Sequence, residues 1–282
     1  MNRTSKFSLF AAAIFSLTAC VDNQTPPPEL EAYQPGETPV LDCVPELNGR
    51  IDADQLQASI GTPVGYRISP AGEERAVDLR GQMDGDGVRI WDWSTAHPTD
   101  QRLEIEATEL IGKWYASDFP DGEFTTLLNP DLNWDGIYSH DDRGLHFHGY
   151  ASVTENPSAG KTLVKYNEPV TLYQFPLEAG REWSSHGVVR NATIQGIPYA
   201  GEDTYETKVD ARGELWLPDL LFTDVLRVNT QVTIDPSIGT ASTHRQVSFF
   251  FECFGEVARV MSQQGEEEEE FTTAVEMRRL GF

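Results

Sequence analysis

Residues 226–234 read Leu-Arg-Val-Asn-Thr-Gln-Val-Thr-Ile, in which side chains suited to a core alternate with side chains suited to water. Because successive side chains of a β-strand point to opposite faces, this pattern predicts a half-buried strand. The stretch from Tyr205 to Ala211 repeats it, with Thr207 and Val209 on the same face as its two ends. These stretches place the chain in the mainly β class.

The same alternation spreads outward along the chain. Val247, Phe249 and Phe251 share a face, and the period would turn Cys253 inward with them. The stretch Asp-Gly-Asp-Gly at 84–87 predicts a hairpin, because Asp-Gly readily adopts the positive φ of tight turns. Helical periodicity is scarce. We therefore expect an antiparallel β-sandwich or a strongly curved sheet, forming a single domain over residues 41–282.

The first 19 residues have the features of a secretion signal. Arg3 and Lys6 precede an apolar run from Phe7 to Leu17. This run of about 11 residues is shorter than the roughly 20 that a membrane-spanning helix needs. We therefore interpret residues 1–19 as a signal peptide and exclude them from the folded domain.

The signal ends in Leu17-Thr-Ala-Cys20, which resembles the lipobox of bacterial lipoproteins. The resemblance implies cleavage before Cys20, transfer of a diacylglyceryl group to its thiol and acylation of the new amine with a fatty acid such as palmitate. Such chains would hold the protein to a membrane. The alternative is an ordinary cleaved signal followed by an unmodified cysteine.

The residues after the cysteine bear on the location. In Gram-negative lipoproteins an Asp directly after the lipidated cysteine usually means retention at the inner membrane. This chain has Val21 there, so the resemblance favours a lipid-anchored place in the cell envelope at the outer membrane. Residues 20–40 are rich in Pro, Glu, Gln and Thr, and we expect them to form a flexible tether.

The charge excludes some partners. The chain has 21 basic and 45 acidic residues, a net charge of −24. Removing Arg3 and Lys6 with the signal leaves 19 basic residues against 45 acidic ones, or −26. Binding of nucleic acid requires basic patches, so we expect no nucleic-acid partner. The partner that remains is an unknown envelope or extracellular ligand.

If Cys20 carries lipid, Cys43 and Cys253 remain. An even remainder in an oxidising compartment predicts one disulfide between them.

A second motif predicts a calcium site. Residues 131–142 resemble the Asp-x-Asn-x-Asp-Gly loops of EF-hands and dockerins. The ligands would be Asp131, Asn133, Asp135, the carbonyl of Ile137, Ser139 and Asp142. Calcium would be the only cofactor. The alternative, which we favour, is a surface turn rich in Asp, Asn and Gly.

Three other features have two interpretations each. His146 and His148 alternate on a strand and could ligate zinc, but we favour solvent-facing histidines with Leu145 and Phe147 in the core. The tryptophans could bind sugars, but packing is the commoner role. Residues 266–270 are five glutamates, which we interpret as a solvated hairpin tip.

Short segments between Trp91 and Met261 also resemble, in their order, an uncharacterised β-rich module of secreted and lipidated envelope proteins. Its pieces here include Trp91-Asp-Trp-Ser94, Leu172-Tyr-Gln-Phe-Pro-Leu177 and Gly213-Glu-Leu-Trp-Leu-Pro218. The resemblance implies a location and an architecture, but no activity.

No nucleophile elbow, His-Glu-x-x-His or phosphate-binding loop occurs in the chain. We therefore assign no catalytic residue and favour a non-enzymatic, structural or ligand-binding envelope lipoprotein. The alternative is a secreted glycan hydrolase that uses scattered carboxylates.

Overall fold

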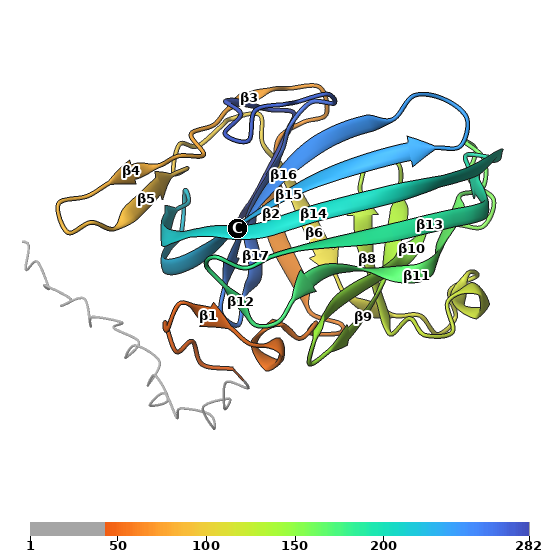
Figure 1. The fold of residues 1–282 in the computed structure, drawn as a ribbon, viewed down its shortest axis with the longest axis horizontal. Coiled ribbons are helices and arrows are strands. Elements are labelled where there is room, and N and C mark those ends of the chain that lie inside the picture. Colours follow the sequence, from red (N-terminus) through yellow and green to blue (C-terminus); the bar gives the residue numbers. More distant parts are fainter. Residues whose placement is uncertain (1–42, 282) are drawn as a thin grey trace, which may run out of the picture. The chain divides into compact units, whose positions relative to one another are not determined.

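The computed structural model describes residues 43–281, and these form a mainly β domain (Figure 1). The predicted signal peptide, Cys20 and the predicted tether lie outside the described residues. The strands are β1 (Arg50–Ile51), β2 (Pro63–Ile68), β3 (Arg75–Ala76), β4 (Gln82–Met83), β5 (Arg89–Asp92), β6 (Gln101–Glu106), β7 (Thr108–Glu109), β8 (Phe124–Asn129), β9 (Trp134–Asp141), β10 (Gly144–Ser152), β11 (Leu163–Gln174), β12 (Leu177–Glu178), β13 (Glu182–Ile194), β14 (Ile197–Trp216), β15 (Leu221–Pro236), β16 (Ser242–Phe251), β17 (Gly255–Met261), β18 (Thr273–Ala274) and β19 (Glu276–Leu280). The helices are the short 3-10 turns η1 (Ala53–Leu56) and η2 (Ala116–Asp118).

One large sheet organises the domain. Its strands follow the order β6-β2-β19-β17-β16-β15-β14-β13-β11-β10-β9-β8-β7, and neighbours along this path are antiparallel. The first and last strands of the path, β6 and β7, are separated in the chain by Ala107 alone. One extended segment therefore pairs with β2 through its first half and with β8 through its second. The sheet is strongly curved and nearly closed, which settles the choice that the sequence left open.

The long strands β14 and β15 form the middle of the sheet, in the register Tyr205↔Val232 and Val209↔Val228. The alternation in 226–234 is confirmed, since Leu226 and Val228 lie in a buried cluster on the inner face. The prediction for Ala211 was wrong. A register shift between Val209 and Ala211, typical of a β-bulge, turns Ala211 toward the outer face.

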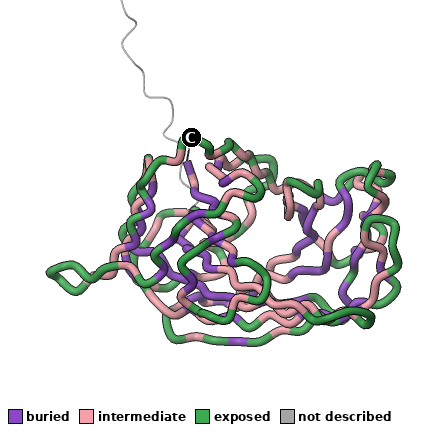
Figure 2. The backbone as a smooth tube through the Cα atoms, turned by 90° about the horizontal axis from the view of Figure 1, so that it is seen from above, coloured by how far each residue is buried: buried purple, intermediate pink, exposed green. Residues whose placement is uncertain are grey.

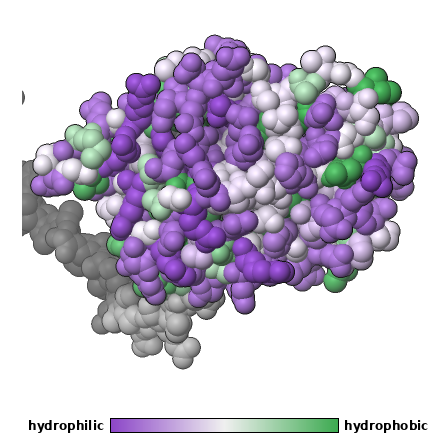
Figure 3. Space-filling view, in the orientation of Figure 1, coloured by the Kyte–Doolittle hydropathy of each residue, from purple (hydrophilic) through white to green (hydrophobic). Residues whose placement is uncertain are grey.

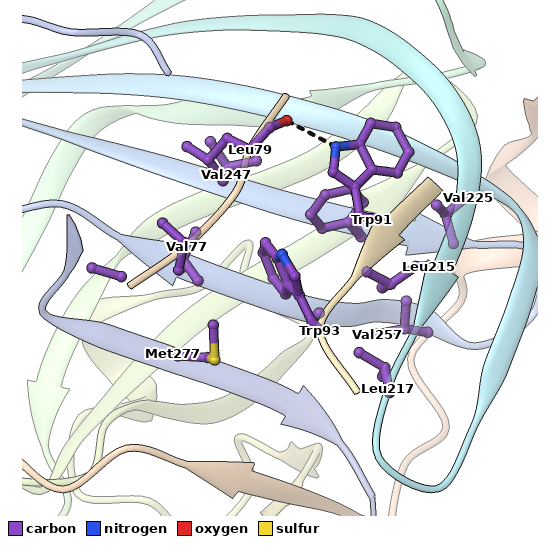
Figure 4. Packing of buried hydrophobic residues seen from close by; sticks show 14 of the residues in the cluster. Val77, Leu79, Trp91, Trp93, Leu215, Leu217, Val225, Val247, Val257 and Met277 are labelled. Carbon is purple, nitrogen blue, oxygen red and sulfur yellow. Dashed lines mark hydrogen bonds between the residues drawn. The ribbon is translucent and has the colours of Figure 1, made fainter. Parts of the chain in front are cut away.

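The outer face of the sheet has its own core, which β5 and the segment 77–79 help to cover. Trp91 of β5 and Trp93, which directly follows that strand, meet the ring of Phe249 edge-on, with ring centres 4.8 and 4.9 Å from it. The indole N–H of Trp91 donates to the carbonyl of Leu79 at 2.8 Å (Figure 4). Val247 and Phe251 belong to the same cluster as Phe249, so their predicted common face is confirmed.

Burial follows the sheet. In Figure 2 the purple, buried segments run along the strands, while turns and the projecting β4–β5 hairpin are exposed. That hairpin turns at residues 84–88, as the Asp-Gly pattern predicts, between the short strands β4 and β5. Figure 3 shows a mostly hydrophilic face, in keeping with the composition of the chain. The inner face of the curved sheet remains for the candidate site.

Candidate functional site

The inner face of the sheet encloses a cavity of about 490 Å³. Its wall is built from β14 and from strands on either side of it, and many of its side chains are aromatic. These rings are Tyr66, Phe124, Trp134, Tyr138, Phe147, Tyr150, Tyr166, Tyr173, Tyr205 and Phe250. Leucine, isoleucine, valine and methionine side chains fill much of the remainder. A concave, largely apolar wall with a few polar groups is typical of a site for a small ligand.

Five of the rings form a continuous stacked row across β8, β9 and β10. Phe124 stacks on Tyr138 at 5.6 Å, Tyr138 on Phe147 at 5.2 Å, and Trp134 on Tyr150 at 5.1 Å. Phe147 and Tyr150 connect these two groups in the middle of the row, with ring centres 6.5 Å apart and planes only 11° apart. Alternation brings the rings of β9 to one face, and on β10 a register shift between Phe147 and Gly149 brings Phe147 and Tyr150 to the same face although they are three residues apart. The row offers a flat apolar surface to a ligand.

One group of charged side chains on the cavity wall neutralises itself. Arg259 lies 3.7 Å from Glu256 and 3.3 Å from Glu276. Arg278 lies 3.4 Å from Glu276. Burial opposes ionisation of Glu276, but Arg259 and Arg278 outweigh it and lower the pKa of this carboxyl. The two glutamates and two arginines therefore balance each other.

A second polar position lies on β14 at Asp203. Its carboxyl oxygen Oδ2 accepts a hydrogen bond of 2.6 Å from the hydroxyl of Tyr166, whereas Oδ1 has no partner among the described residues. The Asp203 residue is 5% exposed. Burial raises the pKa of its carboxyl, and the bond from Tyr166 opposes part of that rise.

Glycine creates the space for this contact. Gly187 of β13 lies opposite Asp203 in the register, between Asp203 and Tyr166. A Cβ at Gly187 would lie 2.5 Å from the nearest ring atom of Tyr166. The missing side chain thus allows the Tyr166 ring to cross β13.

Sequence reasoning missed Asp203, although a signal was present. The alternation that puts Tyr205, Thr207 and Val209 on the inner face places Asp203 there too, two residues earlier. A carboxylate in the apolar phase of a strand is a candidate functional group, because an isolated buried charge is costly.

The predicted calcium loop does not form. Residues 134–141 are the straight strand β9, so the six proposed ligands are spread along it and its two end turns instead of converging. Asp131 and Asn133 precede the strand, Ile137 is buried in the core, and Asp142 lies in the turn at the far end. Asp135 is engaged by protein groups: Tyr115 donates to it at 2.6 Å and Lys113 at 3.2 Å.

The histidines of this hairpin do not gather either. His146 contacts Asp141 at 3.1 Å, and His148 Nε2 lies 2.7 Å from the hydroxyl of Ser139. The expectation that His148 faces solvent was wrong, since it is 9% exposed. Among residues 43–281, no group of three His, Cys, Asp or Glu side chains has the geometry to hold a metal ion.

The contact between Ser139 and His148 has the geometry of a nucleophile and its general base, which are two of the three members of a catalytic triad. A third group that would orient the ring is not seen among its described hydrogen bonds, and neither residue lines the cavity. Burial is the main cause of a lowered pKa of His148. This pair therefore gives no basis for an active site.

The predicted disulfide between Cys43 and Cys253 is present, with a Cα–Cα distance of 5.6 Å. The sequence predicts that Cys253 shares the buried face of Val247, Phe249 and Phe251, but it lies in the turn after β16 with a φ of 68°. The adjacent Glu252 carboxylate accepts hydrogen bonds from the backbone N–H groups of residues 46–48. Disulfide and carboxylate together fasten the start of the domain to the β16–β17 turn.

The acidic run at 266–270 is not simply a solvated tip. Glu269 pairs with Lys208, and Glu270 binds Arg227 at 2.8 Å. Arg227 is buried on the outer face and also binds Asp210 at 2.7 Å. A second, more polar hollow of about 590 Å³ lies on this outer face, with Glu269 at its wall. The ion pairs of Glu269 and Glu270 therefore hold this loop against the sheet.

None of the helices in residues 43–281 is long and apolar enough to cross a membrane. Comparison of the chain with protein-family models, with curated proteins and with solved structures finds no match, so the cavity itself is the guide to function.

Proposed function

We propose that this protein is a lipid-anchored lipoprotein of the bacterial cell envelope whose β domain binds a small, largely apolar ligand. The observation that carries the binding role is the cavity with its stacked row of aromatic rings. The lipobox at Cys20 supports the anchor, and Val21 favours the outer membrane. A small-molecule partner also agrees with an acidic chain that lacks the basic patches of nucleic-acid binders.

The glycan hydrolase is less well supported. Such an enzyme needs one carboxyl group with a raised pKa as the acid and a second carboxylate across the substrate. Asp203 has a raised pKa, but the other carboxylates of the described wall, Glu256 and Glu276, are both engaged in ion pairs with Arg259. The cavity therefore favours binding over hydrolysis.

Ligand binding is tested with a neutral, apolar fluorescent probe such as N-phenylnaphthylamine, whose emission rises in apolar surroundings. We expect saturable binding to the purified chain. Val232→Trp and Leu128→Trp, which fill the cavity from β15 and β8, should each weaken it. Ile238→Trp is the control, because Ile238 is 94% exposed. Equal binding to folded cavity-filled variants, checked by thermal melting, would refute the cavity as the site.

The anchor is tested separately. Cys20→Ser should abolish labelling with radioactive palmitate and leave the protein unprocessed or released from membranes. Undiminished labelling and membrane retention in this variant would contradict the lipoprotein proposal.

A further inference from the structure

We propose that the ligand is an organic cation, an alkyl- or arylammonium compound, whose charged nitrogen lies at Asp203 between tyrosine rings and whose apolar body lies on the stacked aromatic row. The inference rests on the proposed ligand-binding function and names the chemistry of the ligand.

Charge balance in the cavity points to a cation. The charged pairs on the wall, Glu256 and Glu276 with Arg259 and Arg278, sum to zero. Burial and the nearby Arg259 lower the pKa of His244, so this ring adds no positive charge near neutral pH. Asp203 is the remaining charged group of the described wall, and Tyr166 is its hydrogen-bond partner. A ligand that balances the charge of the cavity would therefore carry a positive charge near Asp203.

The unpaired oxygen gives this position a direction. Oδ2 of Asp203 accepts from Tyr166, and Oδ1 is buried without a donor from residues 43–281. An uncompensated buried carboxylate oxygen is destabilising, because it has lost its hydrogen bonds to water and gained none from the protein. An ammonium group would supply both the missing donor and the missing charge, and the bond would be charge-assisted.

The surroundings of Asp203 suit an organic cation. The hydroxyls of Tyr166 and Tyr205 lie 3.3 Å apart beside it, and Tyr150 and Tyr199 pack in the same cluster. The neighbouring strands contribute the uncharged Gly187 and Ile234. Burial raises the pKa of Tyr150 and of Tyr205, so these rings stay neutral. Tyrosine faces attract cations, and aromatic cages are a known way to recognise quaternary ammonium groups.

A metal ion fits this position less well than an ammonium compound. Calcium takes six to eight oxygen ligands, and Asp203 is one carboxylate among aromatic rings. A metal ion would also leave the apolar remainder of the cavity unused. The net charge of −24 raises the local concentration of cations near the protein, which favours the same class of ligand.

The test compares compounds of one chain length by isothermal titration: octyltrimethylammonium, octanol and octanoate. The chain carries Cys20→Ser, so that no acyl group competes. We expect octyltrimethylammonium to bind at least about tenfold more tightly than octanol, or ~1.4 kcal/mol. Asp203→Asn should remove this advantage and leave octanol binding intact. Glu206→Gln, which removes the same charge from the exposed side of β14, is the matched control and should change neither.

Wild-type protein offers a second readout that needs no variant. Affinity for octyltrimethylammonium should fall as acid protonates Asp203, whereas affinity for octanol should stay constant. Equal affinities for cation and alcohol, or an unchanged cation affinity in Asp203→Asn, would overturn the inference and leave ligand binding standing. Tighter binding of octanoate would do the same. No binding of any of the three would refute the proposed function itself.

Discussion

The hydroxyl of Tyr166 donates to Asp203 at 2.6 Å from a strand that is not its neighbour, because β13 runs between them. The contact exists because Gly187 leaves room for the ring. It links β11 and β14 across β13 at a polar position among the tyrosine rings of the cavity wall.

Gly187→Ala should therefore push the Tyr166 ring from its place. We expect a loss of about 1–3 kcal/mol in the free energy of unfolding, as for other overpacked sites, measured by denaturant titration. Gly85→Ala is the control, since nothing lies within 4 Å of a Cβ there, and it should stay within about 0.5 kcal/mol of wild type. Equally small losses in both variants would show that the Tyr166 ring can shift to accommodate a side chain at position 187.

Asp203→Asn should stabilise the protein at neutral pH. Because burial raises the pKa of the carboxyl, the folded state holds its proton longer than the unfolded state. Wild-type stability attributable to Asp203 is then greatest below the unfolded pKa of about 3.9, and it falls as the pH rises through the folded value. Melting temperatures should be higher in the variant near pH 7, and this advantage should vanish toward pH 3. A variant that melts lower than wild type at neutral pH would contradict the unpaired charge.

Arg227→Met should destabilise strongly, because it leaves Asp210 and Glu270 without their cation and frees the acidic loop. Breaking one side of a buried ion pair costs about 3–5 kcal/mol. Lys208→Met removes the more exposed pair with Glu269 in the same loop, and it should cost less than about 1 kcal/mol. Denaturant titration of both variants decides this, and similar losses would show that burial does not govern the pairing.

Asp135→Ala should destabilise the protein without any link to calcium. It removes the carboxylate that accepts from Tyr115 and Lys113 and leaves the Tyr115 hydroxyl only its longer contact with Thr125, and losing a buried hydrogen bond to a charged group costs about 1–3 kcal/mol. The thermal melting curve measured with calcium should coincide with the curve measured with a chelator, both for wild type and for the variant. A calcium-dependent rise that Asp135→Ala abolishes would restore the metal site.

Local alternation predicted the long strands, and the count of cysteines left after the lipobox predicted the disulfide. Local pattern was a poor guide where residues distant in the sequence determine the structure. The alternation at 226–234 predicts β15 because period and burial are both local. The Asp-rich run at 131–142 has the spacing of a calcium loop, but Tyr115 and Lys113, some 20 residues earlier, bind Asp135 and the strand stays extended. The alternation in β14 could have predicted that Asp203 faces the cavity, because it shares a face with Tyr205. The pairing of residues 101–109 with both β2 and β8 has no local signature, since it depends on the curvature of the whole sheet.

The place of β19 in the sheet sets a condition on when the domain can fold. Strand β2 has β6 on one side and β19 on the other, and Met277 donates to Ser69 across a separation of 208 residues. During synthesis, and during the export that the signal peptide predicts, β2 emerges long before β19, so the chain has an open sheet edge and an incomplete cavity until β19 arrives. Contacts this distant in sequence slow folding and prolong exposure to aggregation. The step that closes the sheet therefore comes after nearly all of the domain has been synthesised, which makes protection of the nascent chain a requirement of this topology.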